Sequence, residues 1–281
     1  MHLERIGKHL GAKIHGVDLT KKLSDNLFEE IHAAFLEHMV LIFPEQDLSP
    51  QQLLLVGERF GELEPPHPLI TPHKDEPRVT MIINDAANPP ENEVWHTDVT
   101  WKRTPPLGAA LHAQVLPQHG GDTMWVSMSA VYEALSCEEQ TRFASLKGVH
   151  SIAHGFSGGN YDTKTKDGSR VRDALADYPP LEHPMIRTHP ETGRQAVFVN
   201  ESFTTHIAQL ETEESETILS RIRSLIADPA FQVRVKWEPK MLGIWDERCT
   251  QHQALADYYP EYREMRRVTI VGDEPVYRST L

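Results

Sequence analysis

The stretch that decides the fold is Asn92-Glu93-Val94-Trp95-His96-Thr97-Asp98-Val99-Thr100-Trp101. It is rich in β-branched and aromatic residues, which favour strands. On a strand, residues two apart point to the same face, so His96 and Asp98 would present an imidazole nitrogen and a carboxylate oxygen side by side. That pair is two-thirds of the two-histidine, one-carboxylate triad of non-haem Fe(II) sites. A His-x-Asp pair arises easily by chance among 16 histidines, and the alternative is a surface strand with two polar residues facing water.

The composition is that of a globular protein long enough to bury a full core. The chain has 281 residues, of which 39% are hydrophobic and 25% charged, and we predict one domain, 1–281. A net charge of −13 argues against binding to nucleic acid or to an anionic membrane. The first 16 residues lack the apolar core of a secretory signal, and no apolar run approaches the ~20 residues of a membrane span. Because only two cysteines are present, Cys137 and Cys249, we expect a reducing, cytoplasmic location.

The pattern of apolar residues predicts many short strands and a few helices. Ser49 and Ser136 each begin a capping box, and Thr212 begins an amphipathic helix. Helices collected mainly near both ends of a strand-rich chain indicate a mainly β fold with helical decoration, best matched by a double-stranded β-helix (jelly-roll, cupin-like) core. The predicted strands, besides the opening stretch, are 38–43, 78–84, 108–116, 124–126, 185–187, 195–199, 231–238, 242–245 and 267–271.

Residues 154–180 differ from the rest of the chain. Four glycines, at 155, 158, 159 and 168, interrupt a polar stretch with little periodicity. Loops of this length in compact domains usually act as lids or are disordered. We therefore predict an active-site lid within 154–180 and assign no helix or strand there.

A third metal ligand should come from a late strand or from the loop after it. The best segment is 244–252, Ile-Trp-Asp-Glu-Arg-Cys-Thr-Gln-His, which ends at His252. Three arginines follow, at 263, 266 and 267. They could pair with nearby acids such as Glu261 and Glu264 on the surface. Alternatively, Arg263 and Arg267 project into the barrel and clamp anions through bidentate contacts, with Arg266 on the opposite face.

Several of these motifs together resemble the taurine dioxygenase family of Fe(II)/2-oxoglutarate-dependent oxygenases. The metal motif Trp-His-Thr-Asp at 95–98 is followed by Gly-Gly-Asp-Thr at 120–123 and by the late segment that ends at His252, Arg263 and Arg267. The similarity extends over nearly the whole chain. Further matching stretches lie at 11–20, 187–190, 198–200, 203–205 and 272–273.

The resemblance implies roles for individual residues. The Fe(II) ligands would be His96, Asp98 and His252. The distal carboxylate of 2-oxoglutarate would be held by Thr123 and Arg263. A substrate sulfonate would face Arg267, and the rest of the substrate site would comprise His67, Asn92, the backbone near Val99, Trp101, and Phe156 on the lid.

Two positions depart from the family pattern. A tyrosine is expected in the loop after His67, where this chain has Ile70-Thr71, and the aromatic residue beside the metal motif is Trp101 instead of phenylalanine. Both departures touch the amino end of the substrate pocket. Neither touches the iron site or the 2-oxoglutarate site.

The resemblance also implies a reaction. With Fe(II) and O2, 2-oxoglutarate is oxidatively decarboxylated to succinate and CO2, and the carbon next to sulfur in taurine or a similar small sulfonate is hydroxylated. The product collapses to an aldehyde, aminoacetaldehyde in the case of taurine, and to sulfite, which serves sulfur acquisition. Ascorbate is a candidate stimulant of turnover. A homodimer or homotetramer is expected, with no nucleic-acid or membrane partner.

Three other functions fit parts of the pattern. A related oxygenase could act on an alkyl sulfate, a phenoxyacid or another sulfonate. A zinc-dependent hydrolase could use the same three ligands and a water molecule. A non-enzymatic cupin-like binding protein would need neither an open metal triad nor a second anion clamp.

Overall fold

The largest part of the fold is a seven-stranded sheet. The computed structural model describes residues 1–67, 69–90, 94–156 and 169–279. All neighbouring strands of this sheet are antiparallel except β2 and β3, which run parallel. Their order is β1 (His2–Arg5), β2 (Ala12–His15), β3 (Val40–Phe43), β13 (Leu242–Asp246), β5 (Gly108–Val115), β15 (Arg263–Ile270) and β4 (Thr80–Asn84).

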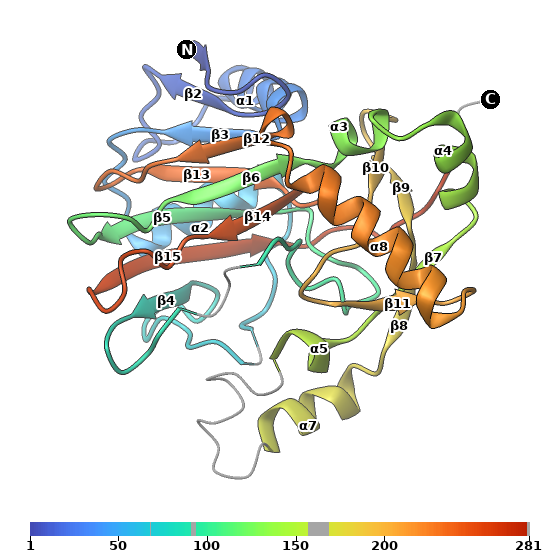
Figure 1. The fold of residues 1–281 in the computed structure, drawn as a ribbon. Helices are drawn as coiled ribbons and strands as arrows, with labels where there is room; N and C mark the ends of the chain where they lie inside the picture. The colour runs from blue at the N-terminus through green and yellow to red at the C-terminus, as the bar shows by residue number, and fades with distance from the viewer. Residues whose placement is uncertain (68, 91–93, 157–168, 280–281) are drawn as a thin grey trace.

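A second, antiparallel sheet packs on the first. Its strands are β12 (Gln232–Val235), β6 (Thr123–Ser127) and β14 (Thr250–Ala254), and they lie over β13 and β5 in Figure 1. Trp125 of β6 and Trp245 of β13 meet with ring centroids 5.7 Å apart, inside one buried apolar cluster. The core therefore lies between the two sheets, as in the predicted jelly-roll.

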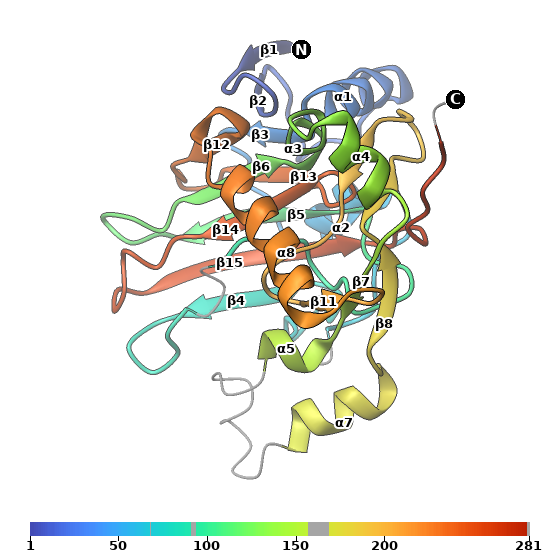
Figure 2. The ribbon, with the colours of Figure 1, turned by 45° about the vertical axis from the view of Figure 1, so that its right-hand side comes forward.

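A further group of strands and helices lies mainly at one end of this core. A three-stranded sheet has the order β11 (Thr204–Ile207), β7 (Lys147–His150) and β8 (Leu181–Pro184), and β9 (Ile186–Thr188) pairs with β10 (Gln195–Val197). Figures 1 and 2 show α8 running alongside the second sheet toward β11. The helices in this region are α3 (Met128–Glu133), α4 (Cys137–Phe143), α5 (Ile152–Phe156), α7 (Ser169–Asp177) and α8 (Thr212–Ile226), with the 3-10 turn η1 (Pro229–Phe231) after α8.

Two helices cover the outer face of the large sheet. Phe35 of α1 (Asp25–His38) and Leu53 of α2 (Pro50–Phe60) are fully buried in a second apolar cluster with Leu41 of β3. The predicted capping boxes at Ser49 and Ser136 are both present, each with reciprocal side-chain and backbone hydrogen bonds. These local signals are confirmed because they depend on residues only three apart.

The opening stretch is not a strand, which corrects the prediction for its described part, 94–101. His96 forms a single antiparallel bridge with His252, and residues 98–101 form a turn in which Val99 has a φ of 56°. The local preference for an extended strand yields to the pairing with β14 and to this turn. His96 and Asp98 are therefore brought together by a bridge and a turn, and not by the two-residue repeat of a strand.

The lid region also differs from the prediction. Helix α7 occupies Ser169–Asp177, where no helix was expected, and α5 begins just before the predicted lid. Residues 157–168 lie outside the described part of the chain.

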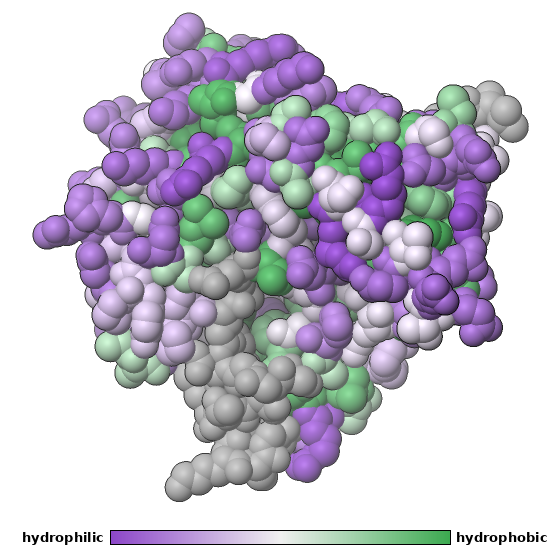
Figure 3. Space-filling model, viewed as in Figure 1, coloured by the Kyte–Doolittle hydropathy of each residue, from purple (hydrophilic) through white to green (hydrophobic). Residues whose placement is uncertain are grey.

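Figure 3 shows mainly hydrophilic residues on the face it presents, with hydrophobic ones in scattered patches. Among the described helices, none combines the length and the apolar character needed to cross a bilayer.

Candidate metal centre and active site

Three buried side chains form a cluster that fits a metal ion. His96, Asp98 and His252 each place one potential ligand atom within 4.8 Å of the others. Two backbone hydrogen bonds, of 3.0 and 2.8 Å, join His96 to His252, and their ring centroids lie 4.2 Å apart. The sequence prediction chose these three residues from segments far apart in the chain, and the fold brings them to one point.

The His96 ring is oriented for metal binding. Its Nδ1 lies 2.8 Å from the carbonyl oxygen of Val94. Nδ1 is therefore the protonated ring nitrogen and donates a hydrogen bond to that carbonyl. Its Nε2 is buried without a hydrogen-bond partner and lies 3.6 Å from Oδ1 of Asp98. Burial lowers the pKa of His96, and it lowers the pKa of His252 well below the usual range. Both rings are therefore neutral at pH 7, as metal ligation requires.

Asp98 is held as a carboxylate. Arg267 Nη1 donates to its Oδ2 over 2.7 Å, which leaves Oδ1 on the side of His96. Burial opposes ionisation, but Arg267 and then the two histidines outweigh it and lower the pKa of Asp98 to about 2. Two neutral imidazoles and one carboxylate are the donor set of a facial Fe(II) triad, and this donor set leaves coordination positions open for other ligands.

Glu247 is a fourth polar group at this cluster, and the sequence analysis gave it no role. It is 1% exposed, and its Oε2 accepts the backbone N–H of Asp98 over 3.1 Å. Its Oε1 accepts the indole N–H of Trp245 over 2.6 Å and lies 3.7 Å from Nδ1 of His252. Burial, followed by the Asp98 carboxylate, raises the pKa of Glu247 well above its usual range. Its position within 244–252 was visible in the sequence, but its contacts were not.

A small cavity of about 70 Å³ connects the metal cluster to two arginines. Arg263 is 4% exposed and donates from Nη2 to the carbonyl of Gly121 over 3.2 Å. Its guanidinium carbon lies 5.7 Å from the ring centroid of Tyr258, and no carboxylate of the described residues pairs with it. A buried cation without an anion is costly, so this cavity suits an anionic ligand. The cavity is lined by Ile82, Asn84, Pro90, His96, Leu111, Thr123, Trp245, His252, Ala254, Tyr258, Arg263 and Arg267.

Thr123 and the arginines of β15 lie as the anion-clamp interpretation requires. The Thr123 hydroxyl oxygen accepts the indole N–H of Trp237 over 2.9 Å, so its own hydrogen can be donated to a ligand. Arg263 and Arg267 are both buried and line the cavity, whereas Arg266 lies 4.0 Å from Glu264. The surface-pair interpretation thus describes Arg266 alone.

Four of the predicted substrate residues, His67, Val99, Trp101 and Phe156, lie close to one another. The His67 ring lies 6.1 Å from the rings of both Trp101 and Phe156. Val99, Trp101 and Phe156 belong to one buried apolar cluster that also contains residues of α7. Asn92 lies outside the described residues. Sequence reasoning missed Tyr178, whose ring is 4.7 Å from Trp101, because α7 was not predicted.

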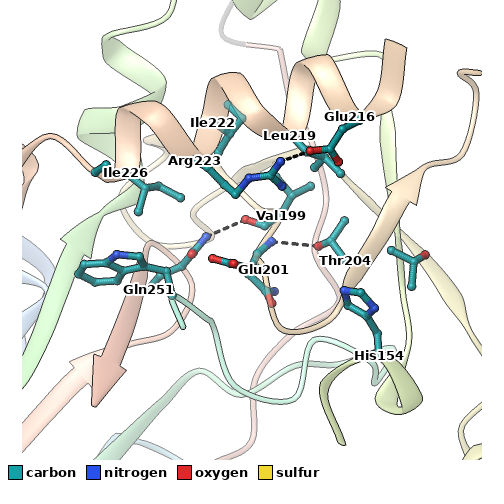
Figure 4. Close-up of a pocket in the computed structure, with 14 residues that line it drawn as sticks. His154, Val199, Glu201, Thr204, Glu216, Leu219, Ile222, Arg223, Ile226 and Gln251 are labelled. Carbon is teal, nitrogen blue, oxygen red and sulfur yellow. Dashed lines mark hydrogen bonds and ion pairs between the residues drawn. The ribbon is translucent and has the colours of Figure 1, made fainter. Parts of the chain in front are cut away.

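A larger cavity, of about 410 Å³, lies beside α8 (Figure 4). Trp95 and Gln251 line it, so the residues next to His96 and His252 in sequence face the opposite way. Its polar groups largely pair with one another: Arg223 with Glu216, and Gln251 with the carbonyl of Val199. Among the described residues that line it, no set of three has metal-ligand spacing, whereas His96 and His252 both line the smaller cavity.

Comparisons with known proteins identify a family of dioxygenases that this chain resembles. Residues 2–269 match the family described as "Taurine catabolism dioxygenase TauD, TfdA family". The chain is 31% identical over 275 residues to an "Alpha-ketoglutarate-dependent sulfate ester dioxygenase" of Pseudomonas putida, covering 96% of this chain and 89% of the relative. It is also 31% identical over 272 residues to an "(S)-phenoxypropionate/alpha-ketoglutarate-dioxygenase" of Sphingobium herbicidovorans, covering 94% and 92% of the two chains.

A solved structure gives the same answer for the fold. The crystal structure of a taurine dioxygenase from Burkholderia xenovorans superposes with a TM-score of 0.84 at 33% identity, covering 98% of this chain and 90% of that one. The jelly-roll prediction is confirmed by this likeness. The chain therefore belongs to the TauD/TfdA family of alpha-ketoglutarate (2-oxoglutarate)-dependent dioxygenases, enzymes that use Fe(II), 2-oxoglutarate and O2.

Proposed function

We propose that this dioxygenase hydroxylates the carbon next to sulfur in a small sulfonate, with taurine as the leading candidate, and so releases sulfite. The observation that carries the proposal is the pair of buried guanidinium groups, Arg263 and Arg267, in the same cavity as the three metal ligands. One anion clamp suffices for 2-oxoglutarate. A second buried cation beside the iron ligand Asp98 suits a substrate that is itself a fixed anion.

In the proposal His96, Asp98 and His252 hold Fe(II), which supplies the oxidising chemistry when 2-oxoglutarate and O2 are bound. Thr123 and Arg263 hold the distal carboxylate of 2-oxoglutarate through charge-assisted hydrogen bonds. That carboxylate would provide the anion that Arg263 lacks among the described residues. Because the proposed site residues extend from 67 to 267 and the buried core from 10 to 270, we propose that the whole chain acts as one catalytic domain.

The substrate would lie between Arg267 and the aromatic side chains of the lid. Arg267 donates a hydrogen bond from Nη1 to Asp98, and its Nε is buried without a hydrogen-bond partner. It can therefore orient the metal carboxylate and still donate to a sulfonate oxygen. His67 accepts the N–H of Leu69 at Nδ1 over 3.1 Å, so its Nε2 carries the proton and is a donor. Trp101 and Phe156 exclude water from the reacting carbon.

The relatives act on different molecules, so the substrate needs a direct test. A sulfate ester and a phenoxypropionate are named for two of them and taurine for the solved structure. The protein should be supplied with Fe(II), ascorbate and 2-oxoglutarate, and then offered taurine, other sulfonates, alkyl sulfates and phenoxyacids. Release of sulfite, sulfate or a phenol identifies the substrate class.

We expect sulfite from taurine or a close sulfonate, in reactions that require both Fe(II) and 2-oxoglutarate. Sulfate release from alkyl sulfates without sulfite from any sulfonate would replace the proposal with the sulfate-ester alternative. Turnover that needs Zn(II) and no 2-oxoglutarate would point instead to hydrolysis.

A further inference from the structure

One side chain outside the ligand set contacts two of the three metal ligands. Glu247 reaches the Asp98 backbone N–H with Oε2 and approaches His252 Nδ1 with Oε1. These ligands come from a turn and from β14, which are far apart in sequence. Glu247 follows β13 directly, and its own N–H is bonded to the carbonyl of Leu107 over 3.0 Å. The carboxyl group thus stands on a fixed backbone behind the cluster.

The two histidines differ in what supports their second ring nitrogen. His96 Nδ1 has the carbonyl of Val94 at 2.8 Å, which fixes its tautomer. His252 Nδ1 is buried without a hydrogen-bond partner, and its ion-pair contact among the described residues is Glu247 Oε1 at 3.7 Å. This separation is longer than the ~2.7–3.2 Å of an N–H···O bond. Catalytic hydrogen bonds in unliganded active sites are often long and shorten when the ligands bind.

We propose that Glu247 is a positioning residue for the metal: it accepts the Nδ1–H of His252, leaves Nε2 of that ring for the ion, and fixes the backbone of Asp98 at the same time. A metal-binding histidine usually donates its other N–H to a carboxylate or a carbonyl, and loss of that partner weakens metal binding about 10–100-fold. The proposal rests on the proposed metal site. It adds a residue to that site and leaves the ligands unchanged.

The contacts explain why a carboxyl group stands at this position. In its carboxylate form, which a bound cation beside it would favour, Glu247 accepts N–H groups with both oxygens, from Trp245 on one side and from Asp98 on the other. A glutamine of the same size has one acceptor and one NH2 group, so one of these N–H groups would meet another donor whichever way the amide turned. The Glu247→Gln variant therefore changes the contacts while it keeps the volume.

The test is a titration of the metal-free full-length protein with Co(II), followed by the absorption of the bound ion. We expect Glu247→Gln to weaken Co(II) binding about 10–100-fold. Glu139→Gln is the matched control, because it makes the same chemical change on α4 at an ion pair with Arg221. Its Co(II) affinity should equal that of the wild type.

A second readout separates positioning from a merely structural role. In the Co(II) protein each ligand histidine gives an exchangeable, paramagnetically shifted N–H signal in the proton NMR spectrum. We expect Glu247→Gln to shift or to speed the exchange of one of these two signals, that of His252. The His96 signal, protected by the Val94 carbonyl, should stay in place and serves as the internal reference.

Unchanged Co(II) affinity together with two unchanged N–H signals would overturn the positioning role of Glu247, even if the variant unfolded more easily without metal. If Glu247→Gln does not fold, the proposal is tested by the exchange rates of the two histidine N–H signals in the wild-type Co(II) protein. Equal protection of the two N–H signals supports the proposal, whereas rapid exchange at His252 contradicts it. Failure of the wild type itself to bind Co(II) would instead refute the proposed metal site.

Discussion

At the scale of single residues, burial fixes the protonation states on which the site depends. His96 and His252 are neutral because burial lowers their pKa values, and Asp98 stays ionised because Arg267 outweighs the cost of its burial. The result is a set of ligands that needs no proton removed at pH 7. Arg263, in contrast, is buried with a carbonyl and a tyrosine ring as neighbours, so it is ready for an anion.

Substitution of a metal ligand should abolish both metal binding and turnover. We expect His96→Ala and Asp98→Ala to reduce Fe(II)-dependent succinate formation to background, because two ligands cannot hold the ion in place. His119→Ala, which changes an exposed histidine, is the control and should retain wild-type activity. Fe(II)-dependent turnover retained in either ligand variant would refute its assignment.

Arg263 and Arg267 should separate in their effects on the two anionic ligands. Arg263→Ala should raise the KM for 2-oxoglutarate, at a cost on the order of 2–5 kcal/mol for a buried charge-assisted contact. Arg267→Ala should weaken the sulfonate more than 2-oxoglutarate, and should also weaken metal binding because Arg267 holds Asp98. If each variant lost affinity for 2-oxoglutarate and for the sulfonate to the same extent, the separate roles of the two arginines would be contradicted.

At the scale of elements, the metal motif lies on a bridge and a turn, and the ends of α5 and α7 contribute aromatic side chains around it. Tyr178, just after α7, packs on Trp101, and Phe156 at the end of α5 faces His67. Tyr178 thus brings an aromatic ring to Trp101 from an element that the sequence did not predict. This contact connects the end of α7 directly to the turn at 98–101.

Removal of the Tyr178 ring should affect the substrate and spare 2-oxoglutarate. We expect Tyr178→Ala to raise the KM for the sulfonate several-fold, because an aromatic pair contributes about 0.5–1.5 kcal/mol beyond its buried area. The KM for 2-oxoglutarate should not change. A control is Tyr262→Ala, an exposed tyrosine bonded to Glu264 on β15. If Tyr178→Ala left the sulfonate KM unaltered, the lid would not contact the substrate.

The sequence predicted those elements whose signals are local. The capping boxes at Ser49 and Ser136 and the alternation that buries Arg263 and Arg267 depend on neighbours within four residues. The strand predicted at the metal motif was wrong because its pairing with His252 and the positive φ of Val99 are set by distant residues. The contact of Glu247 with Asp98 was missed for the same reason, since the two residues are 149 positions apart in the chain.

At the scale of the whole molecule, buried neutral histidines couple stability to pH. Burial lowers the pKa of His183 from 6.5 to about 4 and that of His150 well below its usual range. At a pH between about 4 and 6.5, His183 binds a proton in the unfolded chain but not in the folded chain. Stability is therefore full above pH 6.5 and falls as the pH drops toward 4.

Metal-free protein should accordingly unfold at lower urea concentration at pH 4.5 than at pH 7.5. The contribution of His183 alone is about 3 kcal/mol when the shift is fully expressed. His183→Asn should flatten this pH dependence, even if it lowers stability at pH 7.5 by the loss of the hydrogen bond to the Lys102 carbonyl. An equally steep pH dependence in the variant would show that His183 is not the group that titrates.

Assembly stays a prediction at this scale: a homodimer or homotetramer, which sedimentation of the full chain can establish. The larger cavity beside α8 carries no assigned role. The proposed function requires that oxidation of 2-oxoglutarate be coupled to hydroxylation of the sulfonate, because the two proposed anion sites share one cavity with the proposed metal ligands.

The most direct test of the central claim is the ratio of sulfite to succinate formed from taurine, Fe(II), O2 and 2-oxoglutarate in one reaction. We expect one molecule of sulfite for each molecule of succinate, and slower succinate formation when taurine is left out. Succinate formed at the same rate with and without any sulfonate, and with no sulfite released, would contradict it.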